Sequence, residues 1–292
     1  MSTEGPALVA DAVVDLGSGI SRVLTANPSA MTGPGTNTYL IGDRELIAVD
    51  PGPDDHPEHI EYLLSLVGDR LRYVIYTHHH TDHAPSIVAL SKATGATSLG
   101  YRHPRAPTVD NTIADGEVFS IPGFTLEVLH TPGHSTDSCC YLLHSEASNG
   151  MGPTPPVLFA GDHMFGGSTV SVSPPDGDMT SYFKSLRRVL ELDPVPTFIA
   201  PGHGQVISDA RGTIEYYIAH RLGRETEVME ALRDARRARP ADLVPIIYGD
   251  ELAEGLFRGA RSNVWAHLRK LGDESVVASE DREDPDAYWS LV

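Results

Sequence analysis

The stretch YTHHHTDHAP, residues 76–85, contains four histidines and one aspartate within six consecutive positions. His78, His80, Asp82 and His83 form the pattern H-x-H-x-D-H. Side chains two residues apart in extended backbone point to the same side. We therefore expect the first two histidines to face one metal ion. The aspartate and the last histidine follow a bend and are expected to face a second ion.

Predicted strands and helices alternate around this stretch, which is typical of an α/β fold. The strands are predicted at 38–42, 45–50, 72–77, 124–130, 139–144, 157–162 and 197–204, and the helices at 57–68, 84–95 and 179–192. The Gly-, Pro- and Ser-rich residues 145–156 are predicted to form an exposed loop.

The pattern changes after about residue 210. Apolar residues from Ile214 onward recur at helical spacing and predict a long amphipathic helix, which we expect Pro240 to stop. Further helical segments and two short strands, ESVVAS and AYWSL, follow. This order predicts a small helical, winged-helix-like subdomain over residues 213–292, after a main domain over residues 1–212.

Further candidate ligands follow predicted strands at turns that contain glycine. They are His134 in HTPGHS, Asp162 in FAGDH and His203 in APGHG. Glycine lets the backbone approach a site closely. Seven groups from four separate fragments are the number expected for two metal ions with open coordination positions.

These motifs, H-x-H-x-D-H, TPGHS, GD and PGHG, resemble the metallo-β-lactamase superfamily over roughly residues 30–210. The resemblance implies an α/β fold, a four-layer αβ/βα sandwich. GTNTYLIG, APGHG and the helical C-terminus are most similar to the lactamase-like endoribonuclease branch, which carries a C-terminal winged-helix-like segment.

The resemblance also implies a role for each candidate residue. One metal would be held by His78, His80 and His134, the other by Asp82, His83 and His203, with Asp162 bridging them and Asp50 orienting a ligand. His79, His130 and His163 match no ligand position.

Hydrolysis by hydroxide held between the two metals follows from this ligand set, with Asp82 and Asp162 as the catalytic carboxylates. Imidazole and carboxylate ligands without thiolate suit two zinc ions, with iron or manganese as alternatives. The resemblance disfavours a dedicated zinc β-lactamase, because those enzymes lack the bridging aspartate.

Three functions are compatible with these residues. The first is hydrolysis of a small ester, thioester or lactone, the second is cleavage of single-stranded RNA, and the third is a nucleic-acid-binding regulatory module with structural metal. The net charge of −18 disfavours a polyanion. The stretch 163–179, the expected substrate-contacting loop, contains no Lys or Arg. Arg233, Arg236, Arg237 and Arg239 are interpreted as a solvated helix end, with RNA phosphate contact as the alternative.

The composition indicates where the chain works. It shows neither a signal peptide nor an apolar run of about 18 residues, so we expect a cytoplasmic protein without a membrane span. The only cysteines, Cys139 and Cys140, are adjacent and are expected to pack inside a strand. A small-molecule partner is favoured over RNA, and a dimer is compatible with the sequence.

Overall fold

The computed structural model describes residues 8–145, 155–249, 252 and 255–292. The predicted loop at 145–156 therefore lies almost entirely outside the described residues. The chain divides into two compact units. The first comprises residues 1–131, 137–169 and 191–211, and the second comprises residues 132–136, 170–190 and 212–292. The predicted boundary between residues 212 and 213 stays a prediction.

Two sheets form the centre of the first unit. The seven-stranded sheet contains, in order, β1 (Val13–Gly17), β2 (Ile20–Leu24), β3 (Asn37–Gly42), β4 (Leu46–Val49), β5 (Leu71–Ile75), β6 (Thr97–Tyr101) and β7 (Asn111–Ile113). The five-stranded sheet contains β12 (Ile199–Pro201), β11 (Val157–Gly161), β10 (Cys139–Ser145), β9 (Phe124–His130) and β8 (Val118–Ile121).

The alternating direction of side chains along each strand explains how the two sheets pack. In β3, Tyr39 and Ile41 face the five-stranded sheet, where they join a core with Tyr141 and Phe159. The intervening Leu40 faces the opposite way. Side chains of a strand point alternately to its two faces, so one strand contributes to both cores. The predicted burial of both cysteines in a strand is confirmed, since both are buried in β10.

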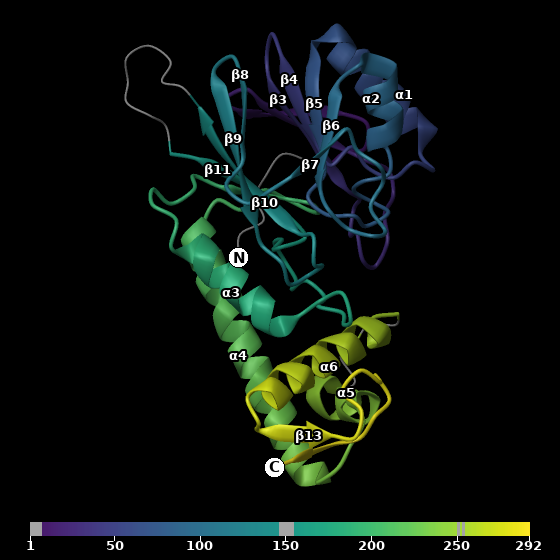
Figure 1. Cartoon of the computed structure of the whole chain (residues 1–292), viewed down its shortest axis with the longest axis vertical. Helices are drawn as coiled ribbons and strands as arrows, with labels where there is room; N and C mark the ends of the chain where they lie inside the picture. The colour runs from purple at the N-terminus through teal and green to yellow at the C-terminus, as the bar shows by residue number, and fades with distance from the viewer. Residues whose placement is uncertain (1–7, 146–154, 250–251, 253–254) are drawn as a thin grey trace. The chain divides into compact units, whose positions relative to one another are not determined.

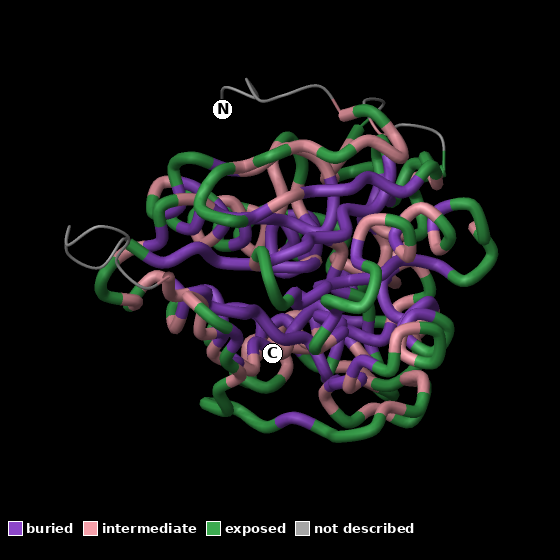
Figure 2. The backbone as a smooth tube through the Cα atoms, turned by 90° about the horizontal axis from the view of Figure 1, so that it is seen from above, coloured by how far each residue is buried: buried purple, intermediate pink, exposed green. Residues whose placement is uncertain are grey.

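Helices α1 (Pro57–Val67) and α2 (Ile87–Thr94) cover the outer face of the seven-stranded sheet (Figure 1). A 3₁₀ turn, η1 (Gly68–Arg70), follows α1. Gly95 ends α2 in the left-handed conformation, at φ 74°, which costs glycine little. Figure 2 shows buried residues, in purple, along the inner stretches of the chain and exposed residues, in green, mainly along the outer ones.

The second unit is mainly helical. It contains α3 (Met179–Leu190), most of α4 (Ala210–Ala235), α5 (Pro240–Tyr248), α6 (Phe257–Asp273) and the antiparallel pair β13 (Val277–Ser279) and β14 (Trp289–Leu291). Its core packs α4, α5 and α6 against the two strands around the fully buried Trp289. No helix among the described residues is long and apolar enough to cross a membrane.

The end of the long helix differs from the prediction. Helix α4 ends at Ala235, and Arg236 follows in the left-handed conformation, at φ 62°. Pro240 does not stop this helix but begins α5. Proline suits the first turn of a helix, where its missing N–H is not needed. The predicted C-terminal strands are confirmed.

Candidate metal centre

Four predicted ligands form a compact cluster within the first unit. The Nε2 atom of His83 lies 3.3 Å from Asp82 Oδ2 and 3.4 Å from Asp162 Oδ1. The Nε2 atom of His203 lies 3.2 and 3.3 Å from the same two oxygens. Ligand atoms bound at about 2.0 Å in tetrahedral geometry lie about 3.3 Å apart. The four atoms therefore have the spacing of ligands around a metal ion.

Sheet topology brings these residues together. The histidine-rich stretch follows β5, Asp162 follows β11, and His203 lies two residues after β12. Strands β11 and β12 are parallel, so their carboxyl ends lie at the same edge of the sheet. Polar groups after strand ends are the usual location of chemistry in α/β folds.

Hydrogen bonds fix the direction of both imidazoles. The Nδ1 atom of His83 donates to Asp50 Oδ2 at 2.9 Å, and that of His203 donates to the carbonyl oxygen of Gly35 at 3.0 Å. A neutral ring that donates from Nδ1 keeps its lone pair on Nε2. Among the described residues, the buried Nε2 of His83 has no hydrogen-bond partner. Both rings are therefore set to present Nε2 to a cation.

Asp50 is held in place by Thr77, which lies two residues after β5. Its Oδ1 accepts from the backbone N–H of Thr77 at 2.6 Å, and its Oδ2 accepts from the Thr77 hydroxyl at 2.9 Å. Asp50 lies directly after β4 at φ 53°, a conformation that Asp adopts more readily than most residues. Its position matches the predicted role of orienting a ligand.

A second group of donors lies beside the first. The Nε2 atom of His78 is 2.9 Å from Nδ1 of His80, with the two rings inclined by 74°. His78 also converges with His83 and Asp162, since one ligand atom from each lies within 4.8 Å of the others. Asp162 thus approaches the histidines of both groups.

Gly202 leaves room for this cluster. A Cβ atom at this position would lie 2.6 Å from His83 Cε1 and 2.7 Å from Asp162 Oδ1. Contacts this short do not occur in proteins. The ligands therefore occupy the space that any other side chain at position 202 would need. The donor set and this close packing both fit a bound metal ion.

Charges within the cluster shift its acid–base equilibria. Burial lowers the pKa of His203, but the charge of Asp162 and the hydrogen bonds to Asp162 and Asp82 together outweigh burial and raise that pKa to about 10. The pKa of His83 is also raised, since Asp82 and its neighbours outweigh burial. Burial raises the pKa of each carboxyl, yet the two imidazoles hold both pKa values well below the usual range. Metal binding would therefore displace protons from both histidines.

His79 makes different contacts. Its Nδ1 lies 2.9 Å from Asp137 Oδ1, and its ring stacks on His103 at 3.8 Å and 17°. These three side chains also come close enough to hold an ion. However, nearly parallel rings direct their in-plane lone pairs side by side rather than towards one point. This geometry agrees with His79 as a non-ligand, which stays a prediction.

Comparison with known proteins identifies the family. The model described as "Metallo-beta-lactamase superfamily" matches residues 31–203. The Drosophila melanogaster protein named "Beta-lactamase-like protein 2 homolog" is 34% identical, with 95% of this chain and 96% of that protein covered. The chain belongs to the metallo-β-lactamase superfamily. It is therefore a metallo-hydrolase of that superfamily.

Further comparisons cover the C-terminal residues of this metallo-β-lactamase superfamily member as well. The "Beta-lactamase associated winged helix domain" matches residues 240–289. An "Atrochrysone carboxyl ACP thioesterase" of Claviceps purpurea is 30% identical over 93% of this chain and 86% of its own. A beta-lactamase domain protein of Burkholderia ambifaria shares the fold, with a TM-score of 0.79 and 22% identity over 97% of this chain and 94% of its own. The predicted sandwich and winged helix are confirmed, and the endoribonuclease branch stays a prediction.

Two other histidines are the predicted ligand His134 and His130, which was predicted not to be a ligand. His134 lies in the second unit, where its Nδ1 donates to the carbonyl oxygen of Ser171 at 2.7 Å. This bond keeps the lone pair on Nε2, as a ligand requires. His130 stacks on Tyr101 with ring centroids 4.1 Å apart. The ligand role of His134 stays a prediction.

The contribution of GTNTYLIG to the site was not predicted, because strand periodicity explained those residues. Gly35 accepts the hydrogen bond from His203, and the Thr36 hydroxyl lies 3.4 Å from Asp82 Oδ2. Asn37 is completely buried, which is unusual for this residue type. The polar triplet before an apolar strand was the signal that could have indicated this role.

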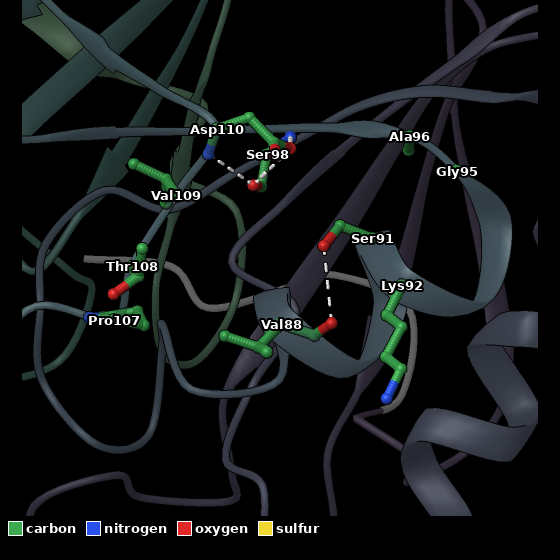
Figure 3. Close-up of a pocket in the computed structure, with 10 residues that line it drawn as sticks. All are labelled: Val88, Ser91, Lys92, Gly95, Ala96, Ser98, Pro107, Thr108, Val109 and Asp110. Atoms are coloured by element: carbon green, nitrogen blue, oxygen red, sulfur yellow. Dashed lines mark hydrogen bonds between the residues drawn. The ribbon is translucent and has the colours of Figure 1, made fainter.

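A groove of about 730 Å³ lies elsewhere in the first unit, between α2 and residues 107–110 (Figure 3). None of the candidate ligands lines it. The carboxylate of Asp110 points back to Ser98 and accepts hydrogen bonds from its backbone N–H and its hydroxyl, at 2.8 and 2.7 Å. Asp110 and Ser98 are thus engaged with each other, and the catalytic candidates lie in the metal cluster.

Proposed function

We propose that the protein is a dinuclear metal-dependent hydrolase of a small thioester, working in the cytoplasm. The observation that carries this proposal is the spacing of 3.2–3.4 Å between the imidazoles of His83 and His203 and the carboxylates of Asp82 and Asp162. Two zinc ions, with iron or manganese as alternatives, would supply an acidified water molecule and positive charge for the substrate oxygen.

The protein's own residues have defined tasks in this reaction. His78, His80 and the predicted ligand His134 would hold one ion, and Asp82, His83 and His203 would hold the other. The Asp162 carboxylate would help to hold both ions and would accept a hydrogen bond from the attacking water. Asp50 would keep the His83 ring in its ligand orientation through their 2.9 Å hydrogen bond.

The leaving group favours a thioester over an oxoester. Each imidazole and carboxylate of the cluster is committed to a metal ion in the proposed set. A leaving group that needs little protonation therefore fits best. A thiol has a pKa of about 8.5, so a thiolate departs near neutral pH much more readily than an alkoxide. The ACP thioesterases named among the relatives cleave this class of bond and support the proposal.

The net negative charge and the paired arginines disfavour RNA as the substrate. Polyanion binding depends mainly on Lys and Arg contacts with phosphates. In the arginine group near the end of α4, Arg237 pairs with Glu280 at 2.7 Å and Arg239 pairs with Asp242 at 2.8 Å. Together with the net charge of −18, these pairings favour a small substrate of low charge.

The test is a substrate panel with purified protein. Acyl-pantetheine, acyl-CoA, the matching oxoester, a lactone, a β-lactam and single-stranded RNA are each assayed at physiological salt. Acyl-pantetheine should turn over fastest, because it is an uncharged thioester. Chelator should abolish this turnover, and added zinc should restore it. The restored protein should bind two ions per chain. RNA cleavage without thioester turnover would replace this proposal with the nuclease.

A further inference from the structure

Asn37 joins the strand that opens the domain to the turn that carries His203. Its Nδ2 donates to the carbonyl oxygens of Pro201, at 3.0 Å, and Gly204, at 2.9 Å. Its backbone N–H donates to the carbonyl oxygen of Gly202 at 2.8 Å. One residue thus holds three carbonyl groups on both sides of His203.

The residues beside Asn37 complete this connection. Gly35 accepts the Nδ1 proton of His203, so its carbonyl oxygen sets the rotation of that ring. The Thr36 hydroxyl donates to Asp82 Oδ2 at 3.4 Å, and residues 36 and 203 pair as an isolated antiparallel bridge. The two proposed ligands therefore share one support, the segment 35–37.

The burial of Asn37 makes this arrangement costly. Its side chain is fully buried, and among the described residues its Oδ1 has no hydrogen-bond partner. A buried polar atom without a partner destabilises the folded protein. An apolar residue facing the core would avoid that cost. The stabilising contribution of this amide is its two Nδ2 hydrogen bonds. Both acceptors lie in the turn around His203.

We propose that Asn37 is a positioning residue for the metal site that contains His203. By clamping the carbonyl groups of Pro201 and Gly204, it places the His203 ring where Gly35 can orient it and where Nε2 faces Asp82 and Asp162. This inference rests on the proposed function, since it takes His203 as a ligand. It predicts that Asn37 affects one of the two metal sites, the one formed by Asp82, His83 and His203.

The variants Asn37→Ser, which keeps one donor, and Asn37→Asp, which places oxygen against carbonyl oxygen, test this inference. The matched control is Tyr39→Phe, because the Tyr39 hydroxyl donates to the same Pro201 carbonyl at 2.8 Å but does not reach Gly204. Affinity for each of two zinc equivalents is measured by chelator competition. The visible spectrum of the cobalt-substituted protein and the melting midpoint of the metal-free protein are recorded for every variant.

Asn37→Ser should weaken one zinc equivalent about 10-fold and leave the other unchanged, since changes beside a ligand typically cost 10–100-fold. Asn37→Asp should weaken the same equivalent further and change the cobalt spectrum, while Tyr39→Phe should keep both affinities. Wild-type affinity at both sites in folded Asn37 variants would overturn the positioning role, as would equal weakening of both sites. A wild-type protein that binds fewer than two ions would instead overturn the proposed function.

Discussion

Gly202→Ala tests whether the space at this glycine controls the metal centre. The new Cβ would lie 2.6 Å from Cε1 of His83, whereas ordinary contacts begin at 3.4 Å. The ring must therefore retreat by about 0.8 Å to restore a normal van der Waals distance. His83 is completely buried, so it cannot move into solvent. Asp162 Oδ1, at 2.7 Å from the same Cβ, must move as well.

These displacements set the expected magnitudes. Overpacking a buried position typically costs about 1–3 kcal/mol of folding stability. Two ligands displaced by a large part of an ångström should weaken metal binding by at least about 10-fold, the lower end of the effect of altered ligand support. Gly95→Ala is the matched control, because its Cβ contacts nothing within 4 Å while its φ of +74° costs an alanine about 1–2 kcal/mol.

The assay compares both variants with wild type. Zinc affinity is measured by chelator competition, and unfolding is measured by denaturant titration of the metal-free proteins. Both variants should lose similar stability, but only Gly202→Ala should lose metal affinity. Wild-type metal affinity in folded Gly202→Ala, or an equal loss in Gly95→Ala, would refute the steric argument.

Three further predictions concern the same centre. His79→Ala should keep both metal ions, because His79 contacts Asp137, whereas Asp82→Ala should lose at least one; metal analysis showing loss in both variants would contradict this assignment. Asp162→Asn should weaken metal binding by at least about 10-fold in chelator competition, and unchanged affinity would remove Asp162 from the ligand set. The metal-free protein should be less stable at about pH 9.5 than at pH 7, because a folded-state pKa raised from 6.5 to about 10 at His203 gives stability that is lost as pH rises through that range. Equal melting midpoints at the two pH values would contradict this charge coupling.

Local sequence patterns predicted much of the architecture. The strand around Tyr39 and Ile41 was recognisable because apolar residues facing two cores leave a nearly continuous apolar run. Ligand spacing was recognisable because H-x-H-x-D-H fits within the short segment that follows β5. The end of α4 was not recognisable. Arg236 ends the helix in a left-handed conformation that few sequences signal, whereas Pro240 is the residue that usually stops a helix.

Long-range contacts were the main feature that the sequence did not reveal. Asn37 donates a hydrogen bond to Gly204, which lies 167 residues later in the chain. No local sequence pattern links those positions. Gly202 reads as an ordinary turn glycine, although its function is to leave space for His83 and Asp162. These roles depend on which strand ends meet at one edge, and that is decided by topology rather than by neighbours in the chain.

The separation between the segment 35–37 and the turn around His203 also constrains how the protein matures. Asn37 and Pro201 are 164 residues apart, so their contact cannot form until most of the chain has left the ribosome. Contacts of such high sequence separation form slowly, because the intervening chain must first be ordered. A nascent chain therefore has its histidine-rich stretch long before it has the second half of the site. Tight metal binding should therefore occur only after synthesis. Bound metal would then indicate that both sheets have formed.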